Sequence, residues 1–268
     1  MSAPATMPTS EPSSAPTARF ARESFIIFRR QLRMNLRNPA WVVIGMLQPV
    51  LYLLLFGPLL EPLVSQFGAT NAYTFFVPGL LVQLGVFGAM FAGFGLIGEW
   101  REGVIEAERV TPASRTALLM GRLMRDELQL LVQAIILVIL GYILGMDASI
   151  PGIIGGVIIT VLLGGACAAA SNSLALTTKS EDVMAPVLNM VMMPVLLLSG
   201  ILLPMTIGPQ WLQSASAFMP TRHIVDAVRG AFGGDFGLSV TGWGIAWAVV
   251  LFVVGVWWGT ATFRKENA

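Results

Sequence analysis

The chain has 268 residues, of which 55% are hydrophobic and 12% are charged, and its formal net charge is +1. Soluble domains use about 45–50% apolar and about 25% charged residues, so this composition argues against a soluble enzyme and predicts a membrane protein. The near-neutral charge gives no case for nucleic acid as a partner. The single cysteine, Cys167, excludes an internal disulfide and a multi-cysteine metal site.

Two segments precede the first hydrophobic run. Residues 1–18 are rich in Pro, Ser, Thr and Ala without a basic or apolar signal-peptide region, which predicts a disordered tail. Residues 19–38 alternate arginines with apolar side chains at helical spacing, which predicts an amphipathic interfacial helix. Its basic candidates are Arg22, Arg29, Arg30 and Arg33. Two roles remain open: an anchor on anionic lipid, or a strut that also touches a cytoplasmic partner.

The remaining residues, 39–266, predict an all-α domain that crosses the membrane six times. A spanning helix needs about 20 mostly apolar residues. Six runs satisfy this requirement: 41–60, 75–98, 128–146, 152–176, 186–204 and 241–263. Glycine and alanine pairs spaced four residues apart recur within these runs and indicate close helix packing.

The distribution of basic residues predicts the orientation. Of the 16 arginines and lysines, 14 lie before the first span, between spans two and three, between spans four and five, or after the last span. Basic residues near spans are retained on the cytoplasmic side. We therefore expect a multi-pass protein of the plasma (inner) membrane with both termini in the cytoplasm.

Two connections are unusual. Residues 99–127, which connect spans two and three, follow a G-x-G-x-x-G run and are rich in charged residues. The glycines close an apolar span and not a strand, so they predict helix packing and not a dinucleotide site. In this segment, Thr111 and Pro112 predict the cap and first turn of a helix that leads into span three. Residues 205–240 are too polar to span and too apolar for a free loop, which bare spacing leaves unexplained.

The sequence contains no recognisable catalytic constellation. His223 is the single histidine, neither lysine follows a glycine, and no G-x-S-x-G turn occurs, which excludes HExxH zinc, phosphate-loop and hydrolase sites. His223 is interpreted as part of a structural polar face. The predicted spans lack ionisable residues near their centres, which disfavours a proton-coupled carrier. If the protein uses nucleotide energy, another chain must hydrolyse the nucleotide.

Two segments resemble the permease subunits of ABC-2 type exporters, and within them the daunorubicin-resistance-like drug permeases. They are EWREGVIEAERVTPASRTALLMGRL after span two and LLLSGILLPMTIGPQWLQSASAFMPTRHIVDAVRG after span five. With the six-span layout, the resemblance covers residues 19–266. Gly208 stands where a bulky apolar residue often precedes Pro-x-Trp, which is a minor departure from the family pattern.

The resemblance implies a permease without its own nucleotide site, which dimerises with itself or a paralogue and associates with two ATPase subunits that bind ATP and Mg²⁺. It also implies that residues 205–240 form short extracellular helices, and that residues 99–127 and the interfacial helix lie against the ATPase. The expected coupling residues are Glu99, Arg101, Glu102, Gly103, Glu106, Arg109, Thr111, Pro112 and Arg115. No metal site or cofactor is expected in this chain.

The cargo is expected to be hydrophobic or amphipathic, as a drug or antibiotic is. Export of a lipid or lipid-linked glycan is the alternative, and a non-transporting assembly or sensor module is a third possibility. We expect the pathway to run between subunits near spans one, two and five. The polar candidates for its lining are Gln48, Gln83, Asn189 and Ser199, although such groups often hydrogen-bond between helices instead.

Overall fold

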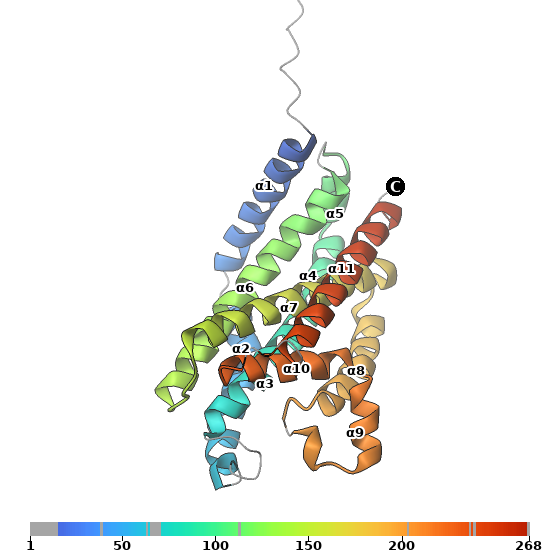
Figure 1. Cartoon of the computed structure of the whole chain (residues 1–268). Helices are drawn as coiled ribbons and strands as arrows, with labels where there is room; N and C mark the ends of the chain where they lie inside the picture. Colours follow the sequence, from blue (N-terminus) through green and yellow to red (C-terminus); the bar gives the residue numbers. More distant parts are fainter. Residues whose placement is uncertain are drawn as a thin grey trace, which may run out of the picture.

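The structure is a computed structural model of the chain, and it describes residues 16–37, 40–62, 64, 71–111, 114–202, 204–235, 237 and 240–266. Most of the predicted N-terminal tail, residues 1–15, lies outside this part. In the described part, every regular element is a helix, and six helices are long and apolar enough to cross a membrane (Figure 1). The predicted all-α, six-span fold class is confirmed.

The six crossings follow the predicted order with altered boundaries. They are formed by α2 (Ala40–Leu60), α3 with α4 (Ala72–Met90 and Ala92–Arg101), α6 (Arg115–Ile143), α7 (Ile150–Thr178), α8 (Glu181–Leu198) and α11 (Thr241–Glu266). The helix predicted to lead into span three and the span itself form one continuous helix, α6, which begins at Arg115. Helix α8 ends at Leu198, before the predicted 204.

The start of α6 also corrects the predicted cap. Ser114, and not Thr111, is the N-cap residue, and its hydroxyl accepts a hydrogen bond from the amide of Ala117 at 3.2 Å. A serine hydroxyl at this position satisfies one of the amides that the first helical turn leaves unpaired. Pro112 lies outside the described residues, and Thr111 is an exposed turn residue.

Helices α3 and α7 form the centre of the bundle, and the other crossings surround them. Helix α7 packs against α3, α4, α6, α8, α10 and α11. Small residues allow this packing: a Cβ on Gly255 of α11 would lie 2.7 Å from the carbonyl oxygen of Ala166 in α7. Helices α2, α8 and α11 leave rows of apolar side chains exposed, as lipid-facing or subunit-facing helices do.

The segment after α8 forms the 3₁₀ turn η2 (Met205–Ile207), α9 (Gln210–Ala217) and α10 (Pro220–Phe232). Helix α10 packs on α3, α7 and α11, and it buries Ile224, Val225, Val228 and Phe232. Its remaining face carries Arg222, His223 and Asp226 at less buried positions. This amphipathic packing explains why residues 205–240 are too apolar for a loop and too polar for a span.

Helix α1 (Pro16–Arg37) lies beside the first part of α6, at the end of the molecule where α5 (Val104–Arg109) and the C-terminus are also found (Figure 1). Ser24, Ile27 and Gln31 are buried in the contact. The close approach depends on Gly121 of α6, where a Cβ would lie 2.6 Å from Ile27 Cγ2 and 2.9 Å from the carbonyl oxygen of Ser24. The amphipathic α1 thus covers the polar part of α6.

Candidate functional site

The predicted coupling segment folds as the end of α4, a two-residue turn and the short helix α5. Glu102 and Gly103 form the turn. Gly103 has a φ of 74°, in the left-handed region that glycine adopts without the steric cost paid by other residues. Glycine at this position therefore allows α5 to start directly after α4 ends.

A buried arginine joins the two arms of this segment. Arg122 of α6 is 2% exposed, and its Nη2 lies 2.6 Å from Oε2 of Glu99 in α4 and 2.8 Å from Oε2 of Glu108 in α5. Its Nε also donates to Glu99 Oε2 at 3.1 Å. A single guanidinium in the fork geometry of arginine thus pairs with two carboxylates on two different helices, α4 and α5.

Helix α1 closes this cluster from the other side. Gln31 Nε2 donates to Glu99 Oε1 at 2.9 Å, and Arg30 Nη1 donates to Glu108 Oε1 at 3.2 Å. We call these five side chains, Arg30, Gln31, Glu99, Glu108 and Arg122, the polar cluster. It connects α1, α4, α5 and α6, so a displacement of α5 must strain or break contacts to the other three helices.

Two predicted coupling residues lie on the opposite, exposed face of the segment. Glu102 and Glu106 are exposed, next to Ala107 and to Val110, whose side chain is 87% exposed. Two carboxylates beside an exposed apolar side chain can contact a partner through both charge and hydrophobic burial. We call Glu102, Glu106, Ala107 and Val110 the outer face of α5.

The other predicted coupling residues are spread around these two surfaces. Arg101 pairs with Glu181 at the start of α8, 3.0 Å apart and half exposed. The hydroxyl of Thr111 donates to the carbonyl oxygen of Glu108 at 2.7 Å, which fixes the end of α5. Arg115 begins α6 and is partly buried. Arg109 ends α5, and its side chain and Pro112 lie outside the described part.

Arg122 and Gln31 were not predicted as site residues, and Glu108 was predicted only as one of the charges of the coupling segment, without its pairing to Arg122. The contacts of the polar cluster join residues 14 to 78 positions apart, and no local spacing indicates such a pairing. One available signal was the Gly121-Arg122 pair in LLMGRL. It combines a residue that permits close helix contact with the arginine at the centre of the cluster.

A second contact ties α1 to the start of α6. Glu23 Oε2 accepts a hydrogen bond from the amide of Ser114 at 2.8 Å, and its Oε1 accepts one from Nε of Arg19 at 2.8 Å. The bond from the Ser114 amide, followed by the contact with Arg19, lowers the pKa of Glu23 below its ordinary value of 4.5. An ionised carboxylate at a helix N-terminus also interacts favourably with the helix dipole.

The predicted pathway residues divide into two pairs. Gln48 of α2 and Asn189 of α8 are exposed on helices that otherwise expose apolar side chains. Gln83 of α3 is 1% exposed, and neither atom of its amide group has a hydrogen-bond partner among the described residues. Ser199 is fully buried and bonds to Thr221 and to the carbonyl of Val195. The latter pair lies inside the subunit in this conformation.

Sequence comparisons relate the chain to membrane transport proteins. The sequence model of a family described as ABC-2 type transporter matches residues 22–232. The daunorubicin resistance ABC transporter permease protein DrrB1 of Streptomyces coeruleorubidus is 25% identical over 233 residues, which cover 86% of this chain and 82% of that protein. A protein of Cyanophora paradoxa named as a transport permease, ycf38, is 26% identical over 221 residues, covering 81% and 76%.

Proposed function

The chain belongs to the ABC-2 type transporter family, and from that premise we propose that it is the membrane subunit of an ATP-driven exporter of hydrophobic or amphipathic, drug-like compounds. Family membership confirms the predicted resemblance and supports a transport permease role. ATP and Mg²⁺ in this family belong to a partner ATPase and not to the permease. The name of the Streptomyces relative supports a drug-like cargo.

The two-faced coupling segment is the observation that carries this proposal. The outer face of α5 is free to receive an ATPase, while the opposite face is tied through the polar cluster to α1 and α6. Movement imposed on α5 by nucleotide-driven closure of a partner would pass into α4 and α6, which continue into spans two and three. We place two ATPase subunits and a second copy or paralogue of this chain in the complex.

The exposed surfaces of α2 and α8 support a pathway between subunits. Helices α2 and α8 bury little of their surface within one subunit, and each exposes one amide side chain, Gln48 and Asn189, among apolar neighbours. An amide facing lipid tails is costly, whereas the same amide facing a subunit interface or a cargo can be satisfied. We therefore place the pathway between two subunits, along α2 and α8. Gln83 and Ser199 would join its lining only after a rearrangement of the helices.

Charge reversal on the outer face tests the coupling role. Glu102→Lys and Glu106→Lys, made separately, are compared with Asp147→Lys, which reverses the charge of an exposed acidic residue between α6 and α7. An exposed charge contributes about 0–1 kcal/mol, whereas an unpaired charge in an interface costs about 2–5 kcal/mol. We expect the two α5 variants to lose assembly with the ATPase, or to assemble with ATP turnover uncoupled from export. If both behave like the parent and like Asp147→Lys, these two residues do not dock on the ATPase.

We propose that the protein lies in the plasma (inner) membrane with both termini in the cytoplasm. Thiol labelling in intact cells tests this orientation. Thr111→Cys and Ser214→Cys are made separately in a Cys167→Ala background, since both positions are exposed. An impermeant reagent should label the cysteine at position 214 in intact cells and the one at position 111 only after permeabilisation. The reverse pattern would show the opposite orientation.

A further inference from the structure

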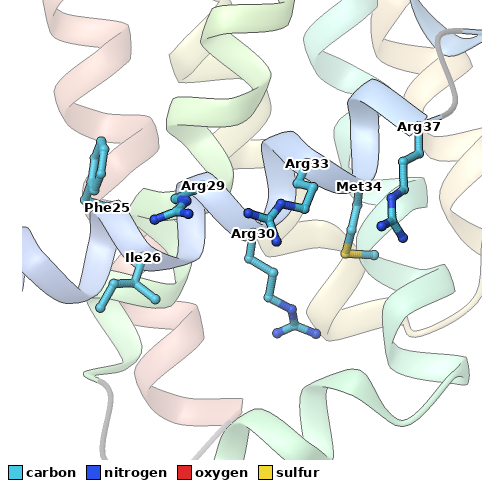
Figure 2. Close-up of a pocket in the computed structure, with 7 residues that line it drawn as sticks. All are labelled: Phe25, Ile26, Arg29, Arg30, Arg33, Met34 and Arg37. Carbon is cyan, nitrogen blue, oxygen red and sulfur yellow. The ribbon is translucent and has the colours of Figure 1, made fainter.

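The face of α1 that points away from α6 forms an open groove. Seven side chains line it, three apolar and four basic (Figure 2): Phe25, Ile26, Met34, Arg29, Arg30, Arg33 and Arg37. Phe25 and Ile26 are each 57% exposed, and Met34 is 47% exposed. The groove therefore combines guanidinium groups with apolar surface that is exposed to solvent.

Three of the four arginines have no acidic partner within the described residues. Arg29, Arg33 and Arg37 follow each other at intervals of four residues, which places them in one row on the helix. Like charges at this spacing destabilise a helix, so the row favours a bound anion. The fourth arginine, Arg30, is the one that reaches Glu108 of the polar cluster.

The position of the groove points to the membrane surface. Helix α1 ends at Arg37, and the first span, α2, begins at Ala40. The basic end of the groove therefore lies at the edge of the bilayer, at the level of the lipid headgroups. A protein with an acidic and apolar surface could also fit this groove, but the position of its basic end, just before the first span, favours a lipid of the bilayer.

We propose that this groove binds an anionic phospholipid of the surrounding leaflet. Arg29, Arg33 and Arg37 hold the headgroup phosphate, for which guanidinium groups have the matching fork geometry. Phe25, Ile26 and Met34 contact the apolar part of the same lipid. Because Arg30 belongs to both the groove and the polar cluster, the bound lipid lies one side chain away from Glu108.

Binding is measured with the purified full-length chain in neutral detergent, titrated with phosphatidylglycerol or phosphatidylcholine, and lipid adducts are counted by native mass spectrometry. Each basic residue near an anionic surface contributes about a fivefold factor to affinity. We expect the parent to prefer phosphatidylglycerol, Arg33→Gln to weaken its retention about fivefold, and the triple variant Arg29→Gln, Arg33→Gln, Arg37→Gln to weaken it about a hundredfold, since the three factors multiply.

Lys265→Gln is the matched control for Arg33→Gln, because Lys265 is an exposed basic residue at the end of α11. Each of these two variants lowers the net charge by one. The retention of phosphatidylglycerol by Lys265→Gln should equal that of the parent. Equal retention of both lipids by the parent, unchanged retention by the triple variant, or equal weakening by Lys265→Gln would each overturn the proposal. Loss of ATPase assembly with unchanged lipid retention would assign the groove to a protein instead. Thermal unfolding of each variant shows whether it is folded. If the triple variant is unfolded, the single surface variant Arg33→Gln tests lipid binding instead.

Discussion

Arg122 and Arg229 lie at opposite ends of this bundle, and different kinds of group stabilise their charges. Arg122 is surrounded by carboxylates, with Glu99 and Glu108 both within 2.8 Å of Nη2. Arg229 of α10 is held by backbone and ring: Nη2 donates to the carbonyl of Ile201 at 3.1 Å, and its guanidinium lies 4.0 Å from the centre of the Phe75 ring. Among the described residues, no carboxylate is within salt-bridge distance of Arg229.

The difference concerns what each arginine connects. Arg122 joins α6 to side chains of α4 and α5, and such side-chain contacts can exchange partners when a helix moves. Arg229 joins α10 to the backbone of α3 and of the turn after α8, which can change only if the backbone itself moves. The contacts at the end with α1 and α5 can therefore rearrange through side chains alone, while those at the α10 end depend on backbone positions.

The largest expected effect comes from Arg122→Met. Removing this cation leaves Glu99 and Glu108 buried near each other, and breaking a buried ion pair from one side costs about 3–5 kcal/mol. Arg30 and Gln31 still contact the two carboxylates, so the lower part of this range is expected. The free energy of unfolding in detergent, followed by tryptophan fluorescence, measures the loss.

Two further variants sharpen this prediction. Adding Glu99→Gln and Glu108→Gln to Arg122→Met removes the unpaired charges and should recover most of the lost stability. Arg101→Met breaks the half-exposed pair with Glu181 and should change stability by about 0–1 kcal/mol. If Arg122→Met and Arg101→Met are equally mild, the polar cluster does not hold the coupling segment in place.

Arg229→Met is expected to have a smaller effect. Burial lowers the pKa of Arg229 to about 10, so the side chain is charged at neutral pH and its loss removes a desolvated cation as well as its bonds. The carbonyl oxygens of Phe75 and Ile201 lose a donor, which costs about 1–3 kcal/mol.

A double-mutant cycle with Phe75→Leu separates the ring contact, whose coupling energy should be about 0.5–2 kcal/mol. If Arg229→Met destabilises the protein as much as Arg122→Met, the contrast between the two ends fails. If the cycle shows no coupling, the ring does not contribute to holding Arg229.

The sequence predicted the crossings well because hydropathy over about 20 residues reflects a local requirement of the bilayer. It also indicated the helix that leads into span three, but not that α1 covers the charged first part of this helix, residues 115–127, because hydropathy does not report such a contact. Spacing alone did not explain residues 205–240, although the resemblance implied short helices there. The half-buried character of α10 depends on α3, α7 and α11, which are distant in sequence.

The candidate site was predicted as a segment but not as an arrangement. Charges at helical spacing indicated the segment, and the resemblance assigned it to coupling. The separation into an exposed pair, Glu102 and Glu106, and a buried pair, Glu99 and Glu108, depends on which side α6 and α1 approach. That information lies in long-range contacts, so charge patterning alone could not supply it.

The smallest expected effect concerns Glu23, a charge held by a backbone group as Arg229 is, but at the end that holds the polar cluster. Glu23→Gln weakens the acceptor for the Ser114 amide at the start of α6, and comparable capping losses cost about 0.5–2 kcal/mol. Because the pKa of Glu23 is lowered in the folded protein, this stabilisation is present above the ordinary value of 4.5 and is lost as the pH falls below it. Hydrogen exchange of the amides in the first turn of α6 should therefore be faster in Glu23→Gln than in the parent at neutral pH, with the difference disappearing in acid as the parent carboxylate is protonated. A difference that persists unchanged in acid would mean that the charge of Glu23 does not tie α1 to α6, and that shape alone, at Gly121, holds the two helices together.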